Sequence, residues 1–121
     1  MSSIEIWDFR STSGHVSGTD LTDFHVEATD GPIGKVDRLS DEVGAQYLVV
    51  DTGPWIFGKH VLLPAGTVVR VEQEEKKVYV DRTKDEIKGG PEFDRAAHDA
   101  DTDYREKYAG YYGPFYGGPL L

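Results

Sequence analysis

The stretch that decides the fold runs over residues 24–88 and reads FHVEATDGPIGKVDRLSDEVGAQYLVVDTGPWIFGKHVLLPAGTVVRVEQEEKKVYVDRTKDEIK. Short β-branched and aromatic segments alternate there with Gly, Pro and Asp at intervals of roughly ten residues. Evenly spaced short strands without helical patterns between them are typical of a sandwich or barrel. We therefore predict a mainly β domain, a small closed barrel of six strands.

The six expected strands are 24–29, 33–39, 46–51, 59–63, 67–72 and 77–82, with a charged loop at 73–76. The segment 46–51 is apolar on both faces, which predicts a buried strand. Gly34 lies inside a strand, where glycine indicates a bulge or a close approach of another backbone.

A short helix is predicted directly after the sixth strand. Thr83 and Glu86 have the spacing of a capping box, in which each side chain bonds a free backbone amide of the other residue. The helix should cover 84–88 and end at Gly89, Gly90 and Pro91. A second helical segment could form within 91–108, whereas Gly and Pro in 110–121 predict no regular helix there.

Two arms flank the expected domain, which we place at 23–94. The N-terminal arm, 1–22, is rich in Ser, Thr, Gly and Asp, and we predict that it is mostly irregular. A hydrophobic island in this arm could dock on the core or on a partner; it consists of Ile4, Ile6, Trp7 and Phe9. The C-terminal tail, 95–121, is first acidic and then rich in Tyr and Gly.

The composition restricts the classes of partner. The 121 residues carry 13 Lys and Arg against 22 Asp and Glu, a formal net charge of −9. Nucleic acid and anionic membranes bind clustered cations, so a basic partner, or none, fits this composition better. The absence of cysteine excludes disulfides and thiolate metal sites. Apolar runs are too short to span a bilayer, and we expect a cytoplasmic protein without stable membrane insertion.

Two motifs resemble catalytic or nucleotide-binding loops. Gly53, Gly58 and Lys59 come within one residue of a phosphate-binding loop, but His60 replaces the required Ser or Thr and no helix is expected to follow. Asp51 in the sequence VVDTG could serve a dimeric aspartyl hydrolase. The same residues are ordinary turn chemistry after a strand, and we favour that interpretation.

Metal sites have weaker signals. Asp99, Asp101 and Asp103 imitate the start of a calcium loop, but the glycine and the final glutamate that such a loop needs are absent. His25 and His60 both fall in predicted strands and could be neighbours across the sheet, although they lack the paired spacing of metal ligands. We expect no catalytic residue, no metal and no cofactor.

The aromatic tail is the strongest candidate for partner binding. Six of its rings fall in the last 18 positions, and aromatic rings dominate buried contact area and cluster at interfaces. Three alternatives are open for these rings: they fold back on a barrel, of the same chain or of a twin, they dock another protein, or the tail is disordered. The predicted partner-binding residues are Trp55, Phe57, Tyr104, Tyr108, Tyr111, Tyr112, Phe115 and Tyr116.

Three segments resemble the PRC-barrel superfamily, which includes the cytoplasmic domain of the photosynthetic reaction centre H subunit and the C-terminal domain of the ribosome maturation factor. They are GPIGKVDRL at 31–39, QYLVVDTGPWIFGKHVLLPAG at 46–66 and VYVDRTKDEIKGGPEFD at 78–94. The opening LTDFHVEATDG at 21–31 and the Tyr/Gly-rich end are similar to stand-alone bacterial members.

This resemblance implies a six-stranded barrel that is frequently dimeric, serves assembly or docking, and has no common catalytic residue. We therefore expect a non-enzymatic, homodimeric interaction module with an unknown protein partner. An alternative is a barrel that binds a small molecule or cation at its mouth through Trp55, Phe57, His25 and His60. A second alternative is the hydrolase built on Asp51.

Overall fold

The computed structural model describes residues 6–15, 18–42, 45–53, 60–91, 93 and 104–116. The strands are β1 (His25–Ala28), β2 (Gly31–Glu42), β3 (Ala45–Asp51), β4 (His60–Pro64), β5 (Val68–Glu72) and β6 (Lys77–Val80). The α-helices are α1 (Lys84–Lys88) and α3 (Tyr104–Tyr112), and the 3-10 helices are η1 (Ala65–Thr67) and η2 (Gly113–Tyr116). All six predicted strands are present, and their ends lie within three residues of the expected ones.

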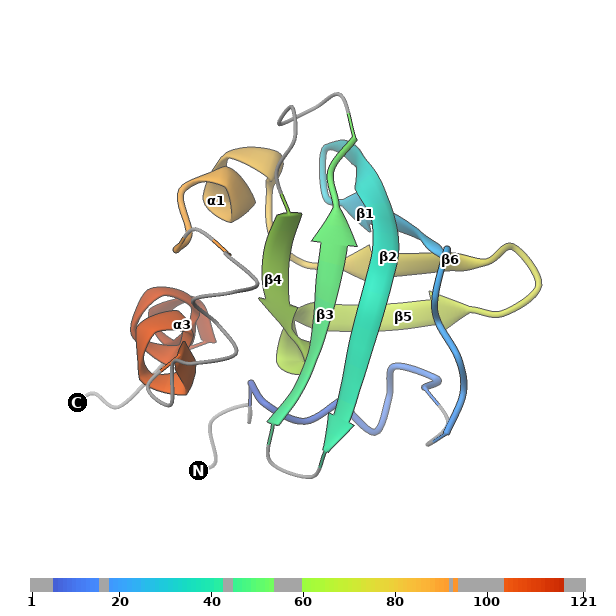
Figure 1. The fold of residues 1–121 in the computed structure, drawn as a ribbon, viewed down its shortest axis with the longest axis horizontal. Coiled ribbons are helices and arrows are strands. Elements are labelled where there is room, and N and C mark those ends of the chain that lie inside the picture. The colour runs from blue at the N-terminus through green and yellow to red at the C-terminus, as the bar shows by residue number, and fades with distance from the viewer. Residues whose placement is uncertain are drawn as a thin grey trace.

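The strands form one mixed sheet in the order β4-β3-β2-β1-β6-β5. The pair β1/β6 is parallel, and every other neighbouring pair is antiparallel. Strands β5 and β6 run across the long strands β2 and β3, so the sheet curls around its apolar side (Figure 1). The prediction of a closed barrel is confirmed in part. The sheet has the six expected strands and is curled, but it is not closed, because β4 and β5 remain edge strands within the described residues. The 3-10 helix η1 redirects the chain between these two strands, and they do not pair as a hairpin.

The core lies on the inner side of this curl. It collects buried side chains from every strand: Val26, Ile33, Val36, Leu48, Val50, Leu62, Val68 and Val78. Burial of each such side chain stabilises the fold by about 1.5–3 kcal/mol relative to exposure. Val49 points away from Leu48 and Val50 and is also fully buried, which confirms the expectation that β3 is covered on both faces.

The described part of the N-terminal arm is irregular, as predicted, and Ile6 and Trp7 are buried in the core. Its backbone joins distant parts of the domain. Gly66 N–H donates to the Ile6 carbonyl oxygen at 2.8 Å, and Val71 N–H donates to the Ser13 carbonyl oxygen at 2.8 Å. The arm therefore covers part of the edge of β5, where unpaired backbone groups would otherwise face solvent. Ile4 lies outside the described residues.

The C-terminal tail differs from the prediction. The sequence suggested helix within 91–108 and none from 110 onward, whereas α3 continues to Tyr112 and η2 follows it. Tyr108 and Tyr112 are four residues apart, so they share one helix face, and both are buried. The burial of these two rings outweighs the low helix propensity of Gly110. Gly110 lies on the open side of the helix, where an added Cβ would contact no other atom.

Gly34 lies both at a bulge and at a close approach of another backbone, the two features that its place in a strand indicated. The register between β1 and β2 shifts next to the pair Val26 and Gly34, which marks a bulge. Gly34 has φ of 148°, and a Cβ added there would lie 2.0 Å from the carbonyl oxygen of Asp51. Only glycine fits at this crossing of β2 and β3, because any side chain would overlap backbone atoms.

The capping box of α1 is present as predicted. Glu86 N–H donates to Thr83 Oγ1 at 3.1 Å, and Thr83 N–H donates to Glu86 Oε1 at 2.9 Å. We expect Thr83→Ala to lower the free energy of unfolding by about 1 kcal/mol, since one cap bond is lost. Urea denaturation measures this change. Lys88→Ala, at the exposed far end of the same helix, is the control and should change the free energy of unfolding by less than about 0.5 kcal/mol. Equal losses of free energy in the two variants would contradict the role of the cap.

Candidate functional site

The aromatic tail packs on its own chain. Tyr108 is 3% exposed and Tyr112 is 1% exposed. The Tyr111 hydroxyl donates to the Glu86 carbonyl oxygen of α1 at 2.6 Å. Among the described residues, Phe115 is the large hydrophobic side chain that remains exposed, at 38%. Buried tyrosines cannot contact a partner directly, so a role of this tail in binding stays a prediction; Trp55 and Phe57 lie outside the described residues.

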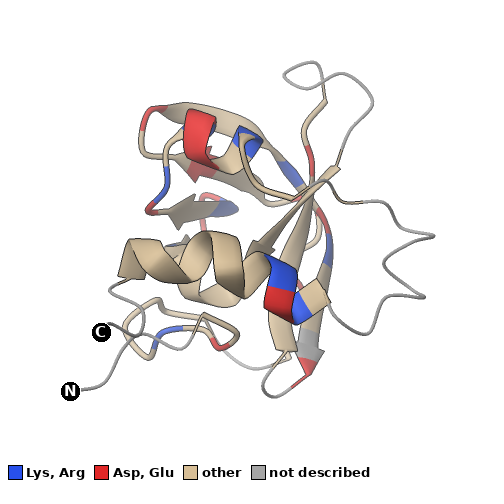
Figure 2. Ribbon diagram, turned by 90° about the vertical axis from the view of Figure 1, so that its left-hand side faces the viewer, with Lys and Arg blue, Asp and Glu red and all other residues tan. Residues whose placement is uncertain are grey.

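The two arms meet in a cluster of three rings. The centroid of Trp7 lies 5.8 Å from that of Tyr104 and 6.4 Å from that of Tyr47, and Tyr47 and Tyr104 are 5.7 Å apart. All three pairs are edge-to-face, a geometry that adds about 0.5–1.5 kcal/mol per pair beyond area burial. Figure 2 shows the charges of α3 gathered near one end of the helix. The helix is therefore held mainly by aromatic contact, partly with the N-terminal arm.

A polar cluster around Asp81 also joins the arms. Arg10 Nη2 lies 2.6 Å from Asp81 Oδ2, and the Tyr116 hydroxyl donates to Asp81 Oδ1 at 2.5 Å. The guanidinium of Arg82 lies 4.5 Å from the ring centroid of Phe115. Because these groups are partly buried, their charge-assisted bonds are screened less than surface ion pairs. No local sequence pattern predicted this cluster, since its members come from three distant segments.

The tail tyrosines predict a stability change in alkali. Burial raises the pKa of Tyr112, and burial together with the hydrogen bond to Asp81 raises the pKa of Tyr116, from an ordinary value of 10.0. The unfolded chain loses these protons near pH 10 while the folded chain retains them. Folding stability should therefore be fully present below this pH and should fall as the pH rises above it.

Urea titrations at increasing pH measure this decline. Tyr116→Phe removes one of the titrating groups, so its decline above pH 10 should be shallower than that of the wild type. A free energy of unfolding that does not change between neutral pH and about pH 11 would show that these hydroxyls are not shielded in the folded chain.

The turn interpretation of Asp51 is confirmed. Gly53 N–H donates to Asp51 Oδ1 at 2.9 Å, and Gly53 has φ of 55°. The carboxylate thus closes its own turn, as Asp often does after a strand. Strand β4 begins at His60, so no helix follows Lys59 and a phosphate-binding loop is excluded. The loop 54–59 itself lies outside the described residues.

The expectation that His25 and His60 are neighbours is wrong. His25 pairs with Lys35, Lys35 pairs with Asp51, and Asp51 pairs with His60, so strands β2 and β3 separate the two histidines. His60 Nε2 instead lies 3.9 Å from Asp37 Oδ2. Within the described ranges, no group of three or more metal-ligating side chains comes together. Asp99, Asp101 and Asp103 lie outside these ranges.

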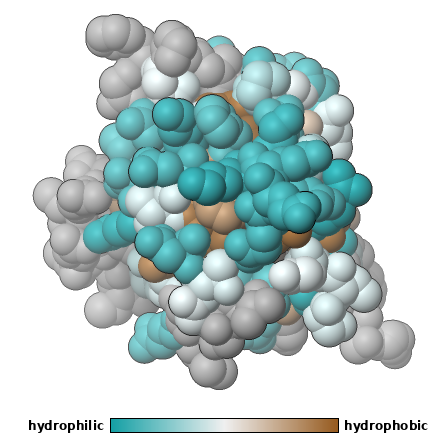
Figure 3. Space-filling view, turned by 90° about the vertical axis from the view of Figure 1, so that its right-hand side faces the viewer, coloured by the Kyte–Doolittle hydropathy of each residue, from teal (hydrophilic) through white to brown (hydrophobic). Residues whose placement is uncertain are grey.

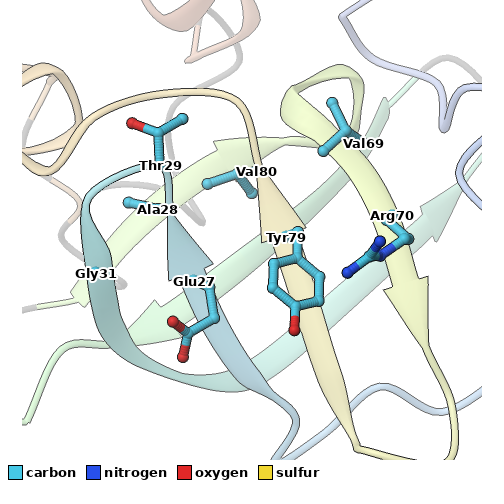
Figure 4. Close-up of a pocket in the computed structure, with 8 residues that line it drawn as sticks. All are labelled: Glu27, Ala28, Thr29, Gly31, Val69, Arg70, Tyr79 and Val80. Carbon is cyan, nitrogen blue, oxygen red and sulfur yellow. The ribbon is translucent and has the colours of Figure 1, made fainter.

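A groove on the outer face of β1, β6 and β5 was missed by the sequence interpretation. Glu27 of β1 pairs with Tyr79 of β6, and Tyr79 pairs with Arg70 of β5, so the three form one row across the sheet. The groove has a volume of about 600 Å³ and is lined by Glu27, Ala28, Thr29, Gly31, Val69, Arg70, Tyr79 and Val80 (Figure 4). Alternation along 77–80 indicated that Tyr79 faces outward, but nothing local predicts the parallel pairing of β1 with β6.

The curled sheet and the capped helix that follows it define a small β domain of the barrel type. The family model described as "PRC-barrel domain" matches residues 14–87, more than half of the chain. The chain belongs to the PRC-barrel domain family, which confirms the resemblance found in the sequence.

Solved structures also match, and five chains do so in all. One is a crystal structure described as a 16S ribosomal RNA processing protein, RimM, from Pseudomonas aeruginosa, with 22% identity and a TM-score of 0.46. The match covers 54% of this chain and 42% of that chain. The matched part of this chain thus covers less than half the length of that protein. No curated protein matches the chain.

Proposed function

We propose that this chain is a non-enzymatic interaction or assembly module that acts as a homodimer and docks a second protein. The observation that carries the proposal is that, among the described residues, the candidate catalytic side chains do not converge and the central tail tyrosines are buried. Asp51 closes a turn, the tail tyrosines fill the core, and the histidines of β1 and β4 stand apart. Since the part of the chain that the structure describes holds no convergent catalytic set, we attribute the function to the surface.

The outer surface supports a polar partner. Hydrophilic residues dominate the face at the right of Figure 1, and apolar atoms are visible only in small areas between them (Figure 3). Large obligate interfaces are more apolar than this. No helix within the described ranges is long and apolar enough to cross a membrane. A cytoplasmic location stays a prediction from the sequence.

The alternatives have less support. A ligand site at the barrel mouth would need His25 and His60 to converge, but two strands lie between them. A hydrolase built on Asp51 would need a carboxylate directed at a substrate, whereas this carboxylate accepts a bond from its own loop. Of the predicted partner-binding residues in the tail, Phe115 has the most accessible ring, so we expect partner contact there rather than at Tyr108 or Tyr112.

Light scattering of the full chain at micromolar concentration tests the homodimer. The expected mass is twice that of the chain, and a monomeric mass would contradict this part of the proposal. Docking is tested by purification of the tagged chain from its native lysate. The unfolded chain serves as the control, and a stoichiometric protein captured only by the folded chain is expected. Capture of the same proteins by both forms would contradict a docking role.

A further inference from the structure

The row of Glu27, Tyr79 and Arg70 presents an aromatic ring between opposite charges (Figure 4). The Arg70 guanidinium lies 4.5 Å from the ring centroid of Tyr79. Arg70 Nε also lies 2.8 Å from Glu72 Oε2 on the same strand. The charge of Arg70 is therefore already compensated, and the groove offers little attraction to an anion.

The negative charge in the row is that of the Glu27 carboxylate, which has no cationic partner among the described residues. Within the described part of the chain, no ion pair or side-chain hydrogen bond engages its carboxylate. A second carboxylate, Glu75 Oε1, lies 3.5 Å from the Tyr79 hydroxyl. The carboxylates around the groove thus belong to Glu27, Glu72 and Glu75. The cations are those of Arg70, of Lys77 on the outer face of β6, and of Lys84, whose Nζ lies beside Gly31 in the lining. The numbers of the two charges are equal, so the attraction for a cation comes from the Glu27 carboxylate and the adjacent ring of Tyr79.

The backbone shapes the groove for a long side chain. Register shifts lie on both sides of it, between Val26 and Glu27 in β1 and between Val68 and Arg70 in β5. Such bulges redirect side chains and bend the sheet locally. Val69, a partly exposed residue of the lining, gives apolar atoms on which an aliphatic stem can lie. An open groove of this kind suits a side chain presented by another protein better than an enclosed small ligand.

We propose that this groove binds a Lys or Arg side chain from an extended, basic segment of a protein partner. The cation lies between the Glu27 carboxylate and the Tyr79 ring, and the aliphatic stem lies along Val69. The net charge of −9 favours the approach of such a segment over long range. This assignment rests on the proposed docking function and names the chemistry of its partner.

Nuclear magnetic resonance of the ¹⁵N-labelled full chain tests the assignment. The probe is the capped peptide Thr-Lys-Thr-Arg-Thr-Lys-Thr, compared with the same peptide carrying Glu in place of Lys and Arg. Saturable amide shifts are expected in β1, β5 and β6 with the basic peptide only. Glu27→Gln should weaken binding about fivefold, because it removes the carboxylate that holds the cation.

Glu74→Gln is the matched control, since this exposed carboxylate lies in the β5–β6 loop and does not line the groove. It makes the same change of net charge, and we expect it to alter affinity less than about twofold. Equal weakening by both substitutions, shifts confined to other surfaces, or no binding of the basic peptide would each overturn the groove assignment. A dimeric mass and a captured partner in that situation would leave the proposed function standing, so the two failures are distinguishable.

Discussion

Gly34→Ala is expected to lower the free energy of unfolding by about 3 kcal/mol or more. The new Cβ would lie 2.0 Å from the Asp51 carbonyl oxygen and 2.9 Å from the Thr52 Cα. Both are backbone atoms, so no side chain can move aside to make room. The φ of 148° is also one that an L side chain rarely adopts. Relief requires β2 and β3 to separate, which breaks pairing in the middle of the sheet.

Circular dichroism during urea denaturation measures this loss. Gly110→Ala is the control, because nothing lies within 4 Å of the Cβ that it adds and the residue is helical. It should stabilise the chain by up to about 1 kcal/mol. A Gly34→Ala protein that fails to fold agrees with the prediction, given that whole domains are stable by only about 5–15 kcal/mol. Native stability in this variant would refute the close crossing.

Tyr112→Ala should cost about 3–5 kcal/mol, the range found for large aromatic residues truncated in a core. Tyr112 is 1% exposed and lies 4.9 Å, centroid to centroid, from the ring of Tyr111. Its removal leaves a cavity between α3 and the domain. Phe115→Ala gives the contrast, since that ring is 38% exposed and should contribute less than about 1 kcal/mol.

Thermal or urea unfolding of both variants checks this difference. If Tyr112→Ala and Phe115→Ala had equally small effects, the tail would not be part of the folded unit, and the aromatic residues would be free for another role. If the predicted difference is found, truncation of the tail is unsuitable as a test of partner binding, because it would also destabilise the domain.

The sequence predicted the features that depend on neighbouring residues. Turn residues such as Gly53 and Asp51 define where strands end, and the pair Thr83 and Glu86 defines where α1 begins. Gly34 was identified for the same reason, since glycine weakens a strand and its place there indicates a bulge or a close backbone approach. The family was also recognisable, because its segments are contiguous.

Features that depend on distant residues were not predictable in the same way. Gly and Pro in the tail argued against helix, yet burial of Tyr108 and Tyr112 stabilises α3. The parallel pairing of Glu27 with Tyr79 builds the groove from segments about 50 residues apart. Likewise, two intervening strands separated His25 from His60. In each case tertiary packing decided a question that local propensity left open.

The N-terminal arm and the C-terminal tail pack on the domain and cover part of its surface. Trp7 and Tyr104 bring the N-terminal arm and α3 together. The bonds of Asp81 to Arg10 and Tyr116 hold η2, at the other end of α3, against the same arm. The sequence left open whether the tail rings fold back on the barrel or dock another protein, and Tyr108 and Tyr112 are found packed in the core of their own chain. The groove on the outer face of β1, β6 and β5 is a further surface, besides Phe115, at which we propose partner contact.

Hydrogen exchange of the full chain tests most directly whether the aromatic tail belongs to the folded unit. The amides of residues 108–112 should be protected to a degree comparable with those of β3, because α3 can open only when its buried tyrosines leave the core. Exchange of these amides at the rate of an unstructured peptide, while β2 and β3 stay protected, would contradict this description of the fold.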